Sequence, residues 1–91
     1  MPPASTSTTP TLAVRVLLFA RYAELVGRET LELTLPPAAT LAHAVAAVRA
    51  LPGGERIPER PLAAVNRRQA VPDAALADGD EVALLPPLAG G

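Results

Sequence analysis

Apolar and polar positions alternate in two early segments of the chain, as they do in strands that are buried on one face. Residues 12–19 (LAVRVLLF) place Val14, Val16 and Leu18 on one side of an extended chain, and an arginine interrupts the other side. Residues 30–35 (TLELTL) alternate strictly and are followed by two prolines, which end strand pairing. These patterns predict two strands, the second of which has one face in water.

Two other segments carry apolar residues at helical spacing. Residues 20–26 (ARYAELV) change to this period, and Gly27 follows where a left-handed C-cap is wanted, so a short helix is predicted. Residues 41–51 (LAHAVAAVRAL) carry an apolar stripe at i, i+3, i+4 and i+7, with Thr40 before them as an N-cap and a Pro-Gly-Gly sequence after them. This segment is predicted to be the main helix.

The second half of the chain predicts two further strands that are separated by turns. Residues 53–61 (GGERIPERP) are rich in turn formers, and residues 62–66 (LAAVN) are short and apolar enough for a strand. Residues 72–76 (PDAAL) have the pattern of one turn of helix with proline at its start, and residues 78–80 (DGD) signal a turn. Residues 81–85 (EVALL) are predicted to form the last strand.

The order of these elements predicts an α+β fold, in which one sheet is covered by one main helix. The two early strands are expected to pair like a hairpin, and a right-handed crossover through the main helix would bring the last strand beside the first. Residues 1–11 are expected to be a disordered leader, residues 12–85 one domain with a small aliphatic core, and residues 86–91 an extended tail.

The composition argues against several classes of function. The formal net charge is −1, from 8 arginines and 9 acidic residues, which argues against a nucleic-acid binder. Lysine and cysteine are absent, so Schiff-base lysine chemistry, a P-loop lysine and thiolate chemistry are excluded. Neither a secretory signal nor an apolar run of about 20 residues, the length that spans a bilayer, is found. A soluble cytoplasmic protein with no membrane partner is expected.

Three segments resemble the small subunits of molybdopterin synthases, a family of ubiquitin-like sulfur carriers with the β-grasp fold. They are residues 17–27 (LLFARYAELVG), 62–66 (LAAVN) and 76–91 (LADGDEVALLPPLAGG). The resemblance covers about residues 12–91, and the ending is its most specific part. It implies a β-grasp domain, with a mixed sheet covered by one main helix, and an extended C-terminal tail.

The last six residues have the composition of a tail that enters another protein. Pro86 and Pro87 favour extended polyproline II geometry, so the tail could project roughly 20 Å from the sheet. Gly90 and Gly91 have no Cβ, which lets the backbone pass through a narrow channel. An α-carboxyl group is ionised at neutral pH and is a poor electrophile, so it needs activation. The residues predicted to bind the partner are Pro86, Pro87, Leu88, Ala89 and Gly90, with Gly91 as the reactive residue.

The resemblance implies a route for this activation. A ubiquitin-activating-like adenylyltransferase would use ATP and Mg²⁺ to adenylate the carboxyl of Gly91, and sulfur from a donor protein would replace AMP to give a thiocarboxylate. The tail would then reach into the large subunit of the synthase and deliver sulfur to cyclic pyranopterin monophosphate, and two transfers would make the dithiolene of molybdopterin. The chain itself would bind no cofactor, would be non-catalytic and would assemble into a heterotetramer.

A docking patch near the exit of the tail is also predicted. Its candidate residues are Phe19, Leu84, Leu85, Arg67 and Arg68. Core burial is the ordinary alternative for the apolar members, and simple exposure in a loop is the ordinary alternative for the arginine pair.

Other candidate residues have structural explanations. His43, the only histidine, is expected to face solvent without a catalytic role. The acidic residues around Gly79 fit a turn better than a calcium loop, so no metal site is predicted.

Three alternative functions stay open beside the synthase subunit. A thiamine-pathway sulfur carrier also ends in two glycines, but usually without the paired prolines. A ubiquitin-like protein modifier would form isopeptide bonds through Gly91; a chain without lysine would form no side-chain-linked polymers on itself. A passive binding module would tolerate loss of Gly91, whereas a sulfur carrier would lose all transfer.

Overall fold

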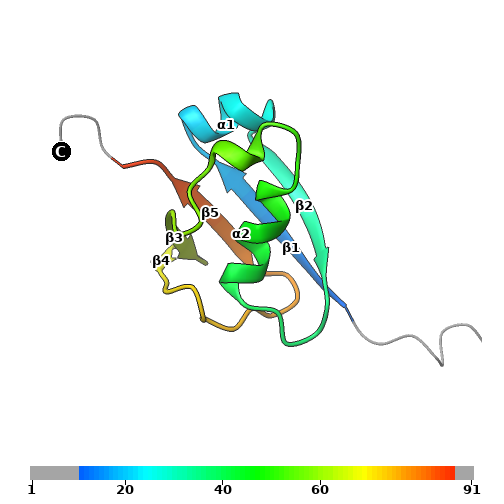
Figure 1. Ribbon diagram of the computed structural model, residues 1–91. Coiled ribbons are helices and arrows are strands. Elements are labelled where there is room, and N and C mark those ends of the chain that lie inside the picture. The colour runs from blue at the N-terminus through cyan, green and yellow to red at the C-terminus, as the bar shows by residue number, and fades with distance from the viewer. Residues whose placement is uncertain (1–10, 88–91) are drawn as a thin grey trace, which may run out of the picture.

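Five strands form one mixed sheet in the computed structural model, in the order β2-β1-β5-β3-β4 (Figure 1). The structure describes residues 11–87. Its elements are β1 (Leu12–Leu18), α1 (Arg21–Val26), β2 (Thr30–Leu35), α2 (Leu41–Arg49), a 3₁₀ helix (Gly54–Arg56), β3 (Leu62–Val65), β4 (Arg68–Gln69) and β5 (Glu81–Leu85). Within residues 11–87, no helix is both long and apolar enough to cross a membrane.

The pairing of the strands confirms the predicted topology. β1 and β2 are antiparallel neighbours, with Val14 opposite Leu33. β5 lies parallel to β1 on its other side, with Leu18 opposite Leu84, and antiparallel to β3. A parallel pair needs a crossover connection, and α2 lies in the chain between β1 and β5. The last strand therefore occupies the middle of the sheet.

α2 covers one face of the sheet and buries its apolar stripe there (Figure 1). Thr40 precedes the helix in an extended conformation, and its backbone N–H donates a hydrogen bond to Nδ1 of His43 at 2.8 Å, which closes the first turn. The strands add alternate side chains from the same face of the sheet. The fully buried side chains of largest volume are Ile57, Leu84, Val14, Val16, Val48 and Val82.

The prediction of a helical turn over residues 72–76 is wrong. This segment contains turns and an isolated bridge between Ala75 and Thr40. The carbonyl oxygens of Pro72 and Ala74 accept hydrogen bonds from the first N–H groups of α2, at 2.8 and 2.9 Å. The first N–H groups of a helix have no partner within the helix. Here they bind carbonyl groups of residues 72–76, and this segment does not form a helix.

Two further details differ from the sequence-based prediction. α2 ends at Arg49 rather than at residue 51. The hydrogen-bond spacing shortens there from four residues to three, and the N–H of Leu51 donates to the carbonyl of Val48 at 3.0 Å. The two-residue strand β4 was not predicted. It pairs back on β3 through a turn at Asn66 and Arg67, both of which have positive φ, at 52° and 72°.

Candidate functional site

β5 is the element that carries the predicted tail. It is hydrogen-bonded to β1 on one side and to β3 on the other, and its Val82 and Leu84 side chains are fully buried. After Leu85 strand pairing stops, with Pro86 half-buried and Pro87 exposed. Proline lacks the N–H group that sheet pairing requires, so the chain leaves the sheet at this point. The remaining tail residues of the prediction, Leu88, Ala89, Gly90 and Gly91, lie outside the described residues.

Asn66 fixes the beginning of β5. Its Nδ2 donates a hydrogen bond to Oδ1 of Asp80 at 2.9 Å, and its Oδ1 accepts one from the backbone N–H of Glu81 at 3.0 Å. The backbone N–H of Asn66 donates to the carbonyl of Glu81 at 2.8 Å. The β3–β4 turn and the start of β5 are thus joined by three bonds around one residue. The sequence pattern predicted Asn66 only as the last residue of a strand, without a role of its own.

The turn before β5 is tied to β1 in the same way. Oδ1 of Asp78 accepts a hydrogen bond from the N–H of Ala13, and the N–H of Gly79 donates to the carbonyl of Ala13, both at 2.7 Å. Oδ2 of Asp80 accepts from the N–H of Ala77 at 2.8 Å. One oxygen of Asp78 and one of Asp80 therefore accept hydrogen bonds from backbone N–H groups, and the turn predicted over residues 78–80 is confirmed. Within residues 11–87, no group of three His, Asp or Glu side chains is placed to hold a metal ion.

The predicted docking patch is divided by the structure. Phe19 is 43% exposed, and Leu85 is half-buried at the end of β5 where the chain leaves the sheet. Leu84 is fully buried and is not available for docking, because successive residues of a strand face opposite sides and Leu84 faces the core. Arg67 and Arg68 are exposed but lie at the other end of β5, since the β3–β4 turn follows the pairing of β3 with the start of that strand.

The face of the sheet opposite α2 is apolar near the exit of the tail. Strand register places the side chains that share this face with Leu85, and together they form what we call the tail-side patch. Leu62 is directly opposite Leu85 and is 46% exposed, and it was not among the predicted docking residues. Successive residues of a strand face opposite sides of the sheet, and this alternation along β3 could have indicated that Leu62 faces away from the core. The tail-side patch consists of Leu17, Leu62, Ala64, Ala83 and Leu85.

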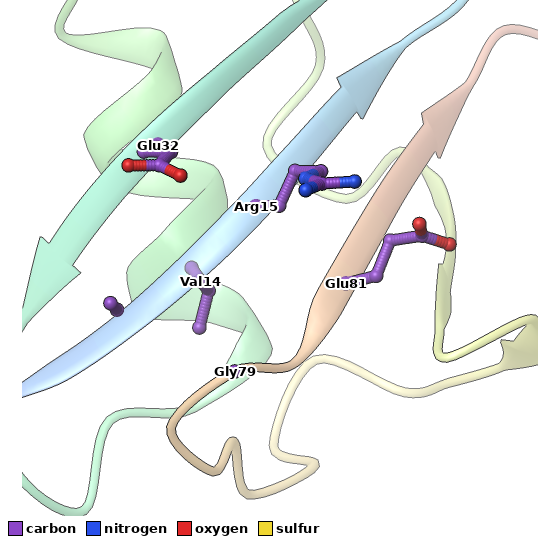
Figure 2. Close-up of a pocket in the computed structure, with 6 residues that line it drawn as sticks. Val14, Arg15, Glu32, Gly79 and Glu81 are labelled. Carbon is purple, nitrogen blue, oxygen red and sulfur yellow. The ribbon is translucent and has the colours of Figure 1, made fainter.

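The far half of the same face is charged. Figure 2 shows Glu32 of β2, Arg15 of β1 and Glu81 of β5 on three neighbouring strands. They border a hollow of about 340 Å³ that also touches Ala13 and Gly79, which have little or no side chain to fill it. A second hollow on the same side adds Arg28 beside Arg15 and Glu32, so the charges there are mixed. The face of the sheet opposite α2 thus has an apolar half at the tail and a charged half away from it.

Two titratable residues show no sign of a catalytic role. His43 is exposed and serves as the hydrogen-bond acceptor that closes the first turn of α2. Tyr22 of α1 is buried in the core, and this burial raises the pKa of its phenol group. The fold of residues 11–87 therefore gives each of these two side chains a structural role.

A family model with the description ThiS family matches residues 16–91. The chain belongs to the ThiS family. This ThiS family member is 32% identical over 84 residues to the molybdopterin synthase sulfur carrier subunit of Arabidopsis thaliana, with 91% of this chain and 88% of the relative covered. The resemblance to the sulfur carriers is confirmed.

Two solved structures show what this ThiS family member resembles in three dimensions. The crystal structure of SAMP1 from Haloferax volcanii matches with a TM-score of 0.77 and 31% identity, over 87% of this chain and 99% of that chain. A chain in the complex of subunits 1 and 2 of the molybdopterin-converting factor from Helicobacter pylori 26695 matches with a TM-score of 0.64 and 25% identity, over 88% of this chain and 100% of that chain. The fold is the ubiquitin-like β-grasp.

Proposed function

We propose that this chain is the sulfur carrier subunit of a molybdopterin synthase, and that the carboxyl group of Gly91 carries the sulfur. The observation that carries the proposal is the point at which the chain leaves the sheet. β5 is paired on both sides, its beginning is bound by Asn66, and the chain leaves it through Pro86 and Pro87. The similarity to a sulfur carrier subunit supports this reading.

The reaction we propose takes place at the end of the tail in two steps. A carboxylate oxygen of Gly91 attacks the α-phosphorus of ATP with Mg²⁺ on an activating enzyme, and pyrophosphate leaves. The outer sulfur of a persulfide on a donor protein then attacks the acyl carbon and displaces AMP, and a thiol of the donor cleaves the resulting acyl disulfide, which leaves a thiocarboxylate on Gly91 and a disulfide on the donor. The domain supplies no catalytic group to either step, and the activating enzyme holds the nucleotide and the metal ion.

The acceptor we propose is cyclic pyranopterin monophosphate on the large subunit of the synthase. Two sulfur transfers, each of which returns Gly91 to a carboxylate, form the dithiolene. The complex of two subunits in the Helicobacter pylori structure supports a large-subunit partner. We place the tail-side patch against that partner, because a protein that encloses the tail also meets the surface around its exit. We further propose a heterotetramer of two small and two large subunits in the cytoplasm.

The test is intact-protein mass spectrometry of the chain after incubation with ATP, Mg²⁺, the cognate activating enzyme and a sulfur donor. We expect the mass gain of one exchange of oxygen for sulfur, and no gain in a chain that lacks Gly91. The sulfurated chain, mixed with the large subunit and cyclic pyranopterin monophosphate, should then yield molybdopterin. No mass gain, with an activating enzyme that acts on another carrier, would overturn the proposal.

A second candidate function is protein modification through Gly91. The similarity to SAMP1 from Haloferax volcanii favours it, because a second solved structure, 27% identical to this chain, carries the name H. volcanii small archaeal modifier protein 1. The activated carboxyl would then be attacked by a lysine amine of a target protein, with loss of AMP and formation of an isopeptide bond. The same reaction mixture, supplied with candidate target proteins, tests this. Conjugates that weigh the sum of the two chains less one water would support modification, and a thiocarboxylate alone would support sulfur transfer.

A further inference from the structure

A groove opens next to the tail-side patch, between the end of β1 and α1. Its volume is about 520 Å³. Phe19, Leu17 and the small side chains of Ala20 and Ala23 form its apolar wall. Leu17 belongs both to this groove and to the tail-side patch, so the two surfaces are continuous.

The groove lies at the end of the sheet from which the tail leaves. Leu18 is opposite Leu84 in the parallel pair of β1 and β5, so Phe19 is level with Leu85 at the same end. A protein that encloses the chain beyond Leu85 therefore meets this end of the domain. The groove is within reach of any partner that accepts the tail.

The backbone holds Phe19 at the surface. The chain turns sharply at Ala20, which has φ 50° and ψ −122°, a conformation that residues other than glycine rarely adopt. The N–H of Tyr22 donates to the carbonyl of Phe19 at 3.0 Å across this turn. As a result Tyr22 enters the core while Phe19, the only phenylalanine of the chain, stays 43% exposed. Strained backbone of this kind is concentrated at functional sites, and aromatic side chains, phenylalanine included, are enriched in the cores of interfaces.

The rim of the groove is acidic. Glu24 of α1 and Glu29 before β2 both border it, both are exposed, and no basic residue lines it. Among residues 11–87, neither carboxylate forms an ion pair within 4.0 Å. Arg28 lines an adjacent hollow together with both glutamates, and Arg21 precedes Glu24 by three residues in α1, but neither arginine forms an ion pair within 4.0 Å of these carboxylates. An apolar wall beside two carboxylates outside any such ion pair is complementary to an apolar side chain that stands next to a cation.

We infer that this groove binds the large subunit of the synthase, through a segment that places an apolar side chain against Phe19 and an arginine or lysine between Glu24 and Glu29. The inference rests on the proposed function, because it takes the large subunit as the protein that accepts the tail. The groove acts as a second contact beside the tail. It would let the partner recognise the folded domain before, and independently of, the thiocarboxylate.

The experiment is isothermal titration calorimetry of the full chain with the large subunit, at two salt concentrations. One variant carries Glu24→Gln with Glu29→Gln, a second carries Glu24→Arg with Glu29→Arg, and a third carries Phe19→Ala. The matched controls are Glu55→Arg with Asp73→Arg, an equal change of charge on exposed residues that form no ion pair within 4.0 Å in residues 11–87, and Val71→Ala, which truncates another exposed apolar side chain. Circular dichroism verifies that each variant is folded.

We expect the charge reversal and Phe19→Ala each to weaken binding about tenfold or more, and the neutral variant to weaken it less and to reduce its salt dependence. Both controls should bind within about twofold of the unmodified chain. Unchanged affinity in the two glutamate variants, which replace exposed side chains, would overturn the groove as the binding site. Glutamate variants that bind the large subunit normally but are no longer adenylated by the activating enzyme would also overturn it, because they would assign the groove to that enzyme. Failure of the unmodified chain to bind the large subunit would instead overturn the proposed function itself.

Discussion

Replacement of Asn66 by alanine would test how firmly the beginning of β5 is held. The change removes one hydrogen bond to the carboxylate of Asp80 and one from the N–H of Glu81. It also puts alanine at a φ of 52°, a left-handed conformation that asparagine tolerates better. We expect the free energy of unfolding to fall by about 2 kcal/mol.

This magnitude has two parts of similar size. A hydrogen bond to a neutral group contributes about 1 kcal/mol and one to a charged group about 1.5–3 kcal/mol. Asn66 is exposed and Asp80 half-buried, so water replaces much of what is lost, and we retain about 1 kcal/mol for both bonds. The left-handed conformation of alanine adds about 1 kcal/mol. Asn66→Gly isolates the first part, because glycine accepts this conformation without steric cost.

Urea denaturation of the unmodified chain and both variants measures the two parts, since the midpoint shifts at constant slope when only stability changes. Hydrogen exchange at the amide of Glu81 reports the local effect, and we expect it to accelerate more than exchange in α2. If both variants stay within about 0.5 kcal/mol of the unmodified chain, the Asn66 side chain does not hold β5. If alanine and glycine cost the same, the conformational part of the reasoning is refuted.

Three further predictions concern the same domain. Gly54→Ala should lower the free energy of unfolding by more than about 3 kcal/mol, because an added Cβ would overlap the backbone carbonyl of Val48. Gly27 lies in open space at φ 85°, so Gly27→Ala should lower it by only about 1 kcal/mol, and thermal denaturation compares the two variants. Arg67→Gly should stabilise the chain by about 1 kcal/mol in urea denaturation, because φ is 72° there, and a loss of stability would contradict this. Burial raises the pKa of Tyr22, so the folded state keeps the phenol proton that the unfolded state loses above about pH 10. The free energy of unfolding should therefore fall as pH rises from about 10 through the pKa of the folded state. In denaturation at alkaline pH, Tyr22→Phe should show a smaller fall in this free energy.

Local pattern was sufficient for the elements that have a clear period. β2 has the bounds predicted from its strict alternation, and the stripe of α2 is buried as its spacing indicated. The two residues of β4 show no period at all, and that strand exists because the turn at Asn66 folds the chain back onto β3. In residues 72–76 a proline followed by an aspartate imitates a helix start, but pairing with the N–H groups of α2 prevails.

The candidate site shows the same division. Glycines and prolines at the end of the sequence predicted the tail, because their effect on the backbone is local. Which of Leu84 and Leu85 faces the core depends on strand register, so two neighbours with identical side chains have opposite surroundings. The arginine pair was grouped with the tail exit, and only the antiparallel pairing of β3 with β5 places the two at opposite ends of the sheet.

The position of β5 explains how this domain could present the reactive chain end that we propose. β5 is paired on both sides and is anchored at its beginning by Asn66 and the turn that contains Asp78, so its other end is fixed in space without a further contact. The proposed reactive end, held in this way, needs no lid or pocket from its own domain, and an enclosed pocket here would compete with the proposed partner for the tail. The choice between partner proteins must then depend on the surface around Leu85. The tail-side patch and the groove beside Phe19 lie there, whereas the charged half of the face opposite α2 is at the far end. Surface substitutions should therefore weaken partner binding more strongly the closer they lie to the exit of the tail.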